Sequence, residues 1–411
     1  MILRKLKHFV LLGTLSLCVT HTHAATIEVL HSWTTSSDLN AIELLEKRML
    51  EEGVTWLPTP PYSTSDFESL NTRVFHGDAP AAVEVKDLDY KQWARLGFLA
   101  NLNAIAAAQE WDLKIPQAVA DVARYDGKYV SVPVSIHRTN WMWVNPFILK
   151  RINQPVPRTW ADFDRVAGAL KAANYPVISL SRDPEKLAQL FEAVVLSIGG
   201  QTLYQDVFVH HDVSAFKQEA FKQAVRRFYT LLSLSEDNTG IDFLATESAF
   251  VFAGDWLSQT IDDSGQPFHQ TYQCEPMPGA PAQFIFKSDS FVFFNLPNIF
   301  EMVNAQTLLA EQMLDERFQR ALNIPRGSIS VRTDASPNGY DRCARKAMAE
   351  LAIASDRNTL LPSVVHGMAT NASVTDRFIE QIQALANNPM SVDESAKALS
   401  RSIRLGNYLL R

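Results

Sequence analysis

The sequence lacks the short patterns that usually reveal an enzyme's chemistry. It contains no G-x-S-x-G, H-E-x-x-H, Walker A or C-x-x-C pattern, so hydrolase, zinc-protease, nucleotide and dithiol chemistry have no motif support. The only adjacent histidines, His210 and His211, would point to opposite faces of a strand, which argues against a metal site. Paired carboxylates of glycosidases are usually far apart in sequence, so a carbohydrate-cleaving enzyme stays open as a weaker alternative.

Basic blocks and long apolar runs are missing too. The chain has 38 Lys and Arg against 45 Asp and Glu and a formal net charge of -7, so we do not expect nucleic acid as a partner. Beyond residue 24, no stretch reaches the roughly 18 uninterrupted apolar residues of a membrane span. We therefore expect a mature protein that is not embedded in a membrane.

The N-terminus has the composition of an export signal. A basic start is followed by the apolar residues 9–19, which are too few for a membrane span, and by a small-x-small cleavage pattern at residues 22–24. Cys18 lies in the apolar run, but Leu17 stands where a lipoprotein signal needs a small residue. We therefore expect residues 1–24 to be a cleaved signal peptide and the mature protein to act in the periplasm.

Cysteine is scarce, with three residues in the whole chain. Cys18 belongs to the expected signal peptide, which leaves Cys274 and Cys343. An even cysteine count in an exported protein indicates a disulfide. Two buried free thiols are the alternative.

Two strand ends near the N-terminus carry polar residues where α/β proteins bind ligands. Residues 26–31 alternate like a strand and lead through a polar turn, with Asp38 as the expected N-cap, into an amphipathic helix over residues 39–50. A second predicted strand, residues 82–85, ends at Lys86. Because ligands bind outside the carboxyl ends of strands in open α/β sheets, Lys86 is a candidate contact. A solvated lysine is the alternative.

Residues 137–146 combine flat apolar faces with hydrogen-bonding groups. They read HRTNWMWVNP and place Trp141 and Trp143 in one short segment with His137. A sugar suits such a mixture, because its C–H groups stack on an indole while its hydroxyls need donors and acceptors. The alternative is that both tryptophans, two apart on a strand, belong to the core.

Two later segments also carry polar groups next to apolar runs. The strand-like residues 248–253 end in Gly-Asp-Trp, which places Trp256 at a strand-to-helix turn. Residues 284–294 form two hydrophobic runs around a polar cluster that contains Asp289. Polar groups inside a buried strand pattern need partners, and a ligand is one candidate.

The chain resembles the extracellular solute-binding proteins of ABC sugar importers over essentially its whole mature length. Within that group it is most similar to the periplasmic glucose-binding proteins. The segments that carry the resemblance are, in order, VLHSWTT, YDGKYVSVPVSIHRTNWMWVNP, PRTWADF, LFEAVVLSIGG, GDW, CEPMPG, FKSDSF, GSISVR and LPSVVHGMA.

This resemblance implies an α/β fold of two lobes, the maltose-binding-protein-like type II arrangement, with a ligand cleft between them. The roughly 385 residues of the mature chain also suggest two domains. We expect the first lobe to contain residues 25–136 and 285–330, and the second residues 137–284 and 331–411. The boundaries between these ranges are then three crossings that form a hinge.

The resemblance also implies roles for individual residues. Trp33 and Trp256 become stacking faces, Lys86 and His366 donors to hydroxyls, and Asp289 an acceptor; Trp141, Trp143 and Asn145 line or support the cleft. The full set of expected sugar-binding residues is Trp33, Asp38, Lys86, His137, Trp141, Trp143, Trp256, Asp289 and His366. We expect no catalytic residue, metal or cofactor.

The chain departs from the family pattern in one half of the cleft. Ser32 replaces a tryptophan, Ser36 and Ser37 replace two glycines, and Asp38 and Glu84 stand for a glutamate and a glutamine. Losing an indole opens a space that either a larger sugar or the protein itself must fill. The identity of the sugar is therefore left open.

These features together predict a periplasmic receptor that closes on a glucose-like hexose, or on a somewhat larger or different sugar. It would deliver the sugar to the membrane permease and ATPase of an ABC importer. The alternative is a sugar-sensing periplasmic subunit that docks on a membrane signalling protein.

Overall fold

The computed structural model describes residues 25–61, 67–238, 248–259, 272–281, 283–296 and 300–408. The expected signal peptide lies outside these residues. Among the helices of the described ranges, none combines the length and the apolar character needed to cross a bilayer.

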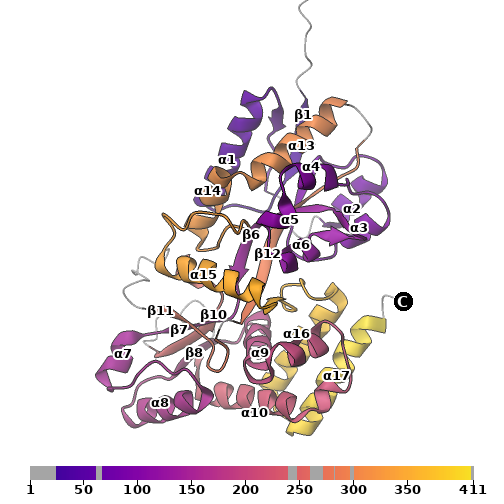
Figure 1. The fold of residues 1–411 in the computed structure, drawn as a ribbon. Coiled ribbons are helices and arrows are strands. Elements are labelled where there is room, and N and C mark those ends of the chain that lie inside the picture. Colours follow the sequence, from indigo (N-terminus) through magenta and orange to yellow (C-terminus); the bar gives the residue numbers. More distant parts are fainter. Residues whose placement is uncertain are drawn as a thin grey trace, which may run out of the picture.

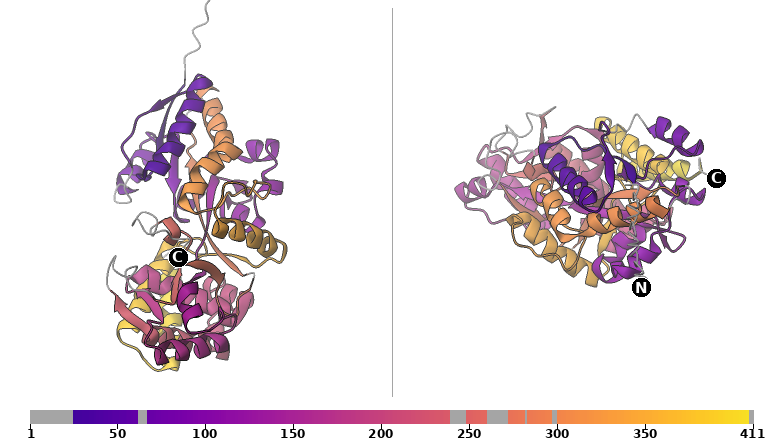
Figure 2. Two further views of the ribbon diagram at one scale, coloured as in Figure 1. Left: turned by 90° about the vertical axis from the view of Figure 1, so that its left-hand side faces the viewer. Right: turned by 90° about the horizontal axis from the view of Figure 1, so that it is seen from above.

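The chain forms two lobes, each built around its own sheet. Seen from the side in Figure 2, indigo and orange segments occupy one end of the molecule, while magenta and yellow segments occupy the other. Each lobe therefore combines segments that are far apart in sequence. This confirms the predicted two-lobed α/β class.

The first sheet has the order β13, β12, β3, β1, β2, and β6 pairs with β12 off this path. β1 is parallel to β2 and β3, whereas β12 is antiparallel to β3 and β6. The strands are β1 (Thr26–Leu30), β2 (Thr55–Leu57), β3 (Ala82–Val85), β6 (Ser131–Arg138), β12 (Phe284–Phe293) and β13 (Leu360–Pro362).

The second sheet has the order β11, β7, β10, β8, β9. β7 lies between two antiparallel neighbours, β10 and β11, so it is covered along both edges. The strands are β7 (Trp141–Val144), β8 (Ile178–Ser181), β9 (Ser235–Asn238), β10 (Phe250–Ala253) and β11 (Gln273–Pro276). A separate hairpin joins β4 (Arg124–Tyr125) and β5 (Lys128–Tyr129).

Helices cover both sheets (Figure 1). Those drawn around the first sheet are α1 (Ser36–Glu51), α2 (Phe67–Phe75), α3 (Lys91–Arg95), α4 (Asn103–Ala108), α5 (Trp111–Lys114), α6 (Gln117–Val122), α13 (Phe300–Leu314) and α14 (Glu316–Arg326). The others are α7 (Pro146–Arg151), α8 (Trp160–Ala172), α9 (Pro184–Phe208), α10 (Glu219–Leu234), α15 (Arg342–Asp356), α16 (Ala372–Asn387) and α17 (Val392–Tyr408).

Local sequence explains why the helices start and bend where they do. Thr159 and Asp162 form a reciprocal capping box at the start of α8, as their spacing predicts. Within α9, Gly200 has φ 69° and interrupts the helical backbone, at the glycine pair that follows the apolar run. Helix α1 begins earlier than expected, so Thr35 is its N-cap and Asp38 is its third residue. The N-cap role predicted for Asp38 was therefore wrong, and its carboxylate is available for another partner.

Three segments near the expected crossings lie side by side. Ile136 in β6 is opposite Ser288 in β12 on one side and forms a bridge with Ile329 on the other. The backbone of Ile136 both donates to and accepts from Ile329, at 2.9 Å. A hinge of adjacent extended segments permits rotation with few broken contacts.

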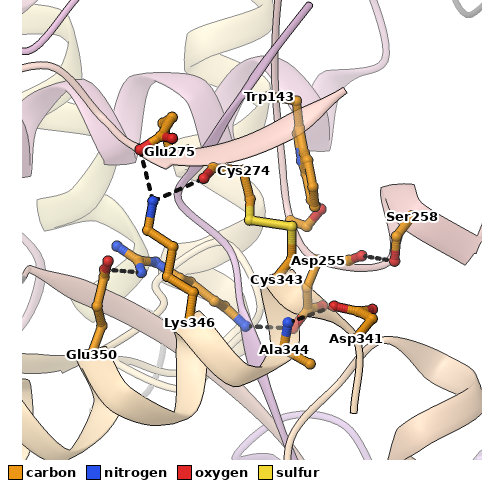
Figure 3. Close-up of a disulfide and its surroundings, with 12 residues drawn as sticks. Trp143, Asp255, Ser258, Cys274, Glu275, Asp341, Cys343, Ala344, Lys346 and Glu350 are labelled. Carbon is orange, nitrogen blue, oxygen red and sulfur yellow. Dashed lines mark hydrogen bonds and ion pairs between the residues drawn. A yellow bond between two sulfur atoms is a disulfide. The ribbon is translucent and has the colours of Figure 1, made fainter. Parts of the chain in front are cut away.

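A disulfide joins Cys274 in β11 to Cys343 in α15, across 69 residues (Figure 3). The bridge predicted from the cysteine count is thus confirmed. The Lys346 ammonium lies beside it and donates to the Cys274 carbonyl at 2.9 Å and to Glu275 at 2.7 Å. The bridge and this ion pair together fix α15 on the edge of the second sheet.

Candidate functional site

A cluster of charged side chains lies where β6 and β12 run next to each other. His137 Nδ1 contacts Asp255 Oδ1 at 2.8 Å, and its Nε2 lies 3.6 Å from Asp289 Oδ2. Asp289 also pairs with Lys287 at 3.1 Å and with Arg326 at 3.2 Å. All three cations come from segments near the crossings, so the cluster spans the hinge.

The charged groups in this cluster shift one another's pKa values. Burial opposes ionisation of Asp289, but Lys287, His137 and Arg326 outweigh it and hold the pKa of Asp289 well below its ordinary value. Burial opposes protonation of His137, yet Asp255 and Asp289 raise its pKa above the usual range. The cluster thus keeps an ionised carboxylate inside the protein. Such a carboxylate is a strong acceptor for hydroxyl groups.

Arg326, at the end of α14, connects this cluster to Trp33 and Asp38, which follow β1. Its Nε donates to Asp38 Oδ1 at 2.6 Å, and its Nη1 donates to Asp289 Oδ2 at 3.2 Å. Its guanidinium also lies 4.5 Å from the centre of the Trp33 ring. Arg326 therefore brings together three residues that we predicted separately. The sequence analysis did not identify Arg326 as a site residue. The available signal was its position directly before residues 327–332, which read GSISVR.

Trp33 is held in place by a hydrogen bond as well as by packing. Its Nε1 donates to Glu84 Oε1 at 2.7 Å, and its ring meets Phe291 edge-on with centroids 5.4 Å apart. The side chain is almost fully buried. The guanidinium of Arg326 faces its ring, so one side of the indole already has a polar neighbour.

A second aromatic group, Trp256, lies next to His137 of the cluster. The Trp256 ring centre is 6.0 Å from that of His137 and 5.4 Å from that of His366. The ammonium of Lys186 lies 5.1 Å from the same indole. Burial, followed by Lys287 and Lys186, lowers the pKa of His366 well below its ordinary value, so this imidazole is neutral at pH 7. Trp256 and His366 are thus brought next to His137.

A buried glutamate supports the loop that carries His366. Glu192 in α9 accepts hydrogen bonds from Tyr204 Oη at 2.5 Å, from Val364 N at 2.6 Å and from Ser363 Oγ at 2.9 Å. Ser363 Oγ also lies 2.9 Å from His366 Nδ1. Burial raises the pKa of Glu192 to about 7. The sequence showed Glu192 only as one carboxylate in an apolar helix.

The two tryptophans of β7 lie in the core. Trp141 is 1% exposed and Trp143 is 0% exposed. The guanidinium of Arg138 covers Trp141 at 3.7 Å, and Trp143 donates to the Gly254 carbonyl. Both side chains are therefore enclosed by protein in this structure. Their expected contact with the sugar stays a prediction, and Asn145 caps α7.

Lys86 directly follows the last residue of β3. It is exposed and lines a cavity of about 270 Å³ next to Ser32 and Glu84. The structure therefore brings together Trp33, Asp38, His137, Trp256, Asp289 and His366, whereas Lys86 lines the cavity and Trp141 and Trp143 are buried in the core. Across the described ranges, no group of three or more His, Cys, Asp or Glu side chains could hold a metal ion.

Two lobes joined by adjacent crossings, with aromatic and ionised groups gathered at the junction, define a class of two-lobed ligand receptors. Comparison with known proteins specifies the family. Residues 58–280 match the family model of bacterial extracellular solute-binding proteins. The chain belongs to this family.

Its relatives match over nearly full length. A probable sugar-binding periplasmic protein of Brucella suis is 31% identical and covers 92% of this chain and 91% of its own. A protein of the same description from Rhizobium meliloti is 30% identical and covers 98% and 99%. These names specify a sugar but not glucose, so the predicted similarity to glucose-binding proteins stays a prediction.

Solved structures share the fold at much lower sequence identity. A chitin oligosaccharide binding protein has a TM-score of 0.72 and 16% identity, covering 94% of this chain and 100% of its own. The solute receptor AcbH, described as preferring β-D-galactopyranose, has a TM-score of 0.76 and 12% identity over the same shares. At this identity the likeness shows the fold alone.

Proposed function

We propose that this protein is a periplasmic receptor that captures a sugar between its lobes and delivers it to an ABC importer. The observation that carries the proposal is the cluster at the crossings. Asp289 pairs there with Arg326, whose guanidinium faces the Trp33 ring, and lies near His137, whose ring is next to that of Trp256. Ionised groups of both signs satisfy sugar hydroxyls, and indoles cover the apolar faces of the ring. The sugar-binding names of the relatives support the same ligand class.

Closure would complete the site, because its residues come from both lobes. In the predicted lobe assignment, Trp33 and Asp38 belong to the first lobe, whereas Trp256 and His366, whose rings are 5.4 Å apart, belong to the second. A sugar that contacts both groups favours the closed arrangement by its differential affinity. In this proposal the protein binds and releases its ligand unchanged, as a receptor and not as an enzyme.

The partners proposed are a membrane permease and its ATPase. Isothermal titration with single hexoses and disaccharides tests the binding step, and we expect at least one sugar to bind with micromolar affinity or better. Deleting the gene then tests delivery: uptake of that sugar should be lost. Persisting uptake together with loss of a transcriptional response would support the sensing alternative instead.

A further inference from the structure

The hydroxyl of Tyr204 contacts two acceptor oxygens beneath the loop that carries His366. Its Oη lies 2.5 Å from Glu192 Oε1 and 2.7 Å from the carbonyl oxygen of Pro362, the last residue of β13. Tyr204 and Glu192 are both 0% exposed. Two hydrogen bonds among these three oxygens need two hydrogens, and the Tyr204 hydroxyl supplies only one, which can go to either neighbour. A carbonyl has no hydrogen to give, so the second one must belong to the Glu192 carboxyl.

A protonated Glu192 satisfies every contact that its carboxyl makes. With a hydrogen on Oε1, Glu192 donates to Tyr204, and Tyr204 donates to Pro362. The same Oε1 accepts from Val364 N at 2.6 Å, and Oε2 accepts from Ser363 Oγ at 2.9 Å. An ionised carboxylate takes the Tyr204 hydrogen itself, and the Pro362 carbonyl then loses it. Burial, which raises the pKa of Glu192 to about 7, favours the same protonated form.

Ser363 connects Glu192 to the imidazole of His366. Its single hydroxyl hydrogen goes to Glu192, so Ser363 Oγ is the acceptor for His366 Nδ1 at 2.9 Å. In the neutral ring the hydrogen is therefore on Nδ1, and Nε2 carries a lone pair. Within the described part of the chain, Nε2 has no hydrogen-bond partner. His366 thus offers an acceptor, where the family resemblance implies a donor.

We infer that Glu192 is a positioning residue whose protonated form holds residues 362–366 so that His366 Nε2 accepts a hydrogen bond from a sugar hydroxyl. Ionisation of Glu192 removes the bond from Tyr204 to Pro362, and the loop loses that support. Sugar affinity therefore falls as Glu192 loses its proton. The inference rests on the proposed function and adds proton binding to it.

Few ionisable groups surround Glu192. In the described ranges, Tyr204 is the ionisable side chain that hydrogen-bonds to it, and burial together with Glu192 keeps the pKa of Tyr204 well above its ordinary value. The helices packed on α9 bring phenylalanines to it, Phe228 of α10 and Phe378 of α16. His366 faces Glu192 through Ser363. The charged groups beyond His366 are Lys186, Lys287, His137, Asp289 and Asp255.

Titration of the full mature protein with glucose, galactose, maltose, cellobiose and lactose, at about pH 6 and about pH 8.5, tests the inference. We expect the Kd of the best sugar to be at least about fivefold larger at the higher pH. Because His137 also titrates, the assignment depends on Glu192→Gln, which should bind with similar affinity at both pH values. The matched change Glu219→Gln, at an exposed position in α10, should keep the wild-type ratio. A wild-type Kd that does not rise with pH, or a wild-type ratio in Glu192→Gln, would overturn the inference.

The tautomer of His366 is a second measurement, which needs no sugar and stays valid if Glu192→Gln does not fold. Nitrogen NMR of the wild type at about pH 6, assigned by comparison with His366→Asn, should show the hydrogen on Nδ1 and a lone pair on Nε2. A hydrogen on Nε2 alone would overturn the inference. Absence of binding by all five sugars at both pH values would instead refute the proposed function for this sugar class.

Discussion

Ser32 donates two hydrogen bonds to the Glu84 carboxylate, one from its backbone N–H at 2.7 Å and one from its Oγ at 2.8 Å. The same carboxylate accepts a third bond from the Trp33 indole. Two positions at which the sequence analysis predicted a departure from the glucose-binding proteins are therefore joined by hydrogen bonds. A glutamine at position 84 would offer only one acceptor oxygen, so the serine and the glutamate depend on each other.

Glu84→Gln should lower the free energy of unfolding by about 2 kcal/mol or more, because buried donors of Ser32 and Trp33 lose a charged acceptor. Glu51→Gln, at an exposed position at the end of α1, is the matched control and should stay within about 0.5 kcal/mol of wild type. Urea unfolding of the three proteins measures both values. Equal stabilities of the two variants would show that the hydrogen bonds to Glu84 add nothing.

Asp289→Asn should leave the protein folded and weaken sugar binding at least about tenfold, or about 1.4 kcal/mol. The amide keeps the shape but removes the charge that Lys287 and Arg326 share. Asp334→Asn, an exposed position that pairs with Arg332, is the control. Titration calorimetry with the best sugar checks the result. An unchanged affinity would show that Asp289 has only a structural role.

Replacing Cys274 and Cys343 together by alanine should lower stability by up to about 4 kcal/mol, since the bridge closes a loop of 69 residues in the unfolded chain. Sugar affinity should change less than about threefold, because in the predicted lobe assignment both cysteines belong to the second lobe, so the bridge would not lock the hinge. Denaturant unfolding and titration of the same sample measure the two effects. A large loss of affinity with little loss of stability would contradict this assignment.

Glu192 should make stability fall as the pH rises. Its pKa is about 7 in the folded protein, against 4.5 for the ordinary side chain. Between these values the native state binds more protons than the unfolded state, so its stability declines from pH 4.5 upward by as much as about 3 kcal/mol at pH 7 and above. Glu192→Gln should remove this part of the pH dependence. Unfolding curves at pH 4.5 and 7.5 that change in parallel for both proteins would contradict it.

Sequence patterns identified the segments of the site better than the roles of their side chains. The strand ends at Trp33 and Lys86 and the polar break at Asp289 could be located because period and turn residues are local signals. Whether Trp141 and Trp143 face a cleft or the core depends on what packs against that face of the second sheet. Lys346, one of the groups that cover the Trp141 ring, lies more than 200 residues later, and no local pattern contains it.

Side-chain partners that are far apart along the chain could likewise not be predicted from the sequence. Arg326 pairs with Asp38, 288 residues away, and Glu192 supports the His366 loop, 172 residues away at Val364. Each pairing depends on the arrangement of both lobes. The disulfide was the exception, because only two cysteines remained to pair.

The central claim, that the junction of the two lobes binds a sugar, is tested most directly by a thermal-shift panel of monosaccharides and disaccharides, with amino acids as controls. A ligand that binds only the native state contributes about 2.7 kcal/mol at 100 times its Kd. We predict that at least one sugar raises the melting temperature by several degrees, that Asp289→Asn diminishes this shift, and that no amino acid produces it. A panel in which no sugar shifts the melting temperature, or in which amino acids shift it equally, would contradict the account.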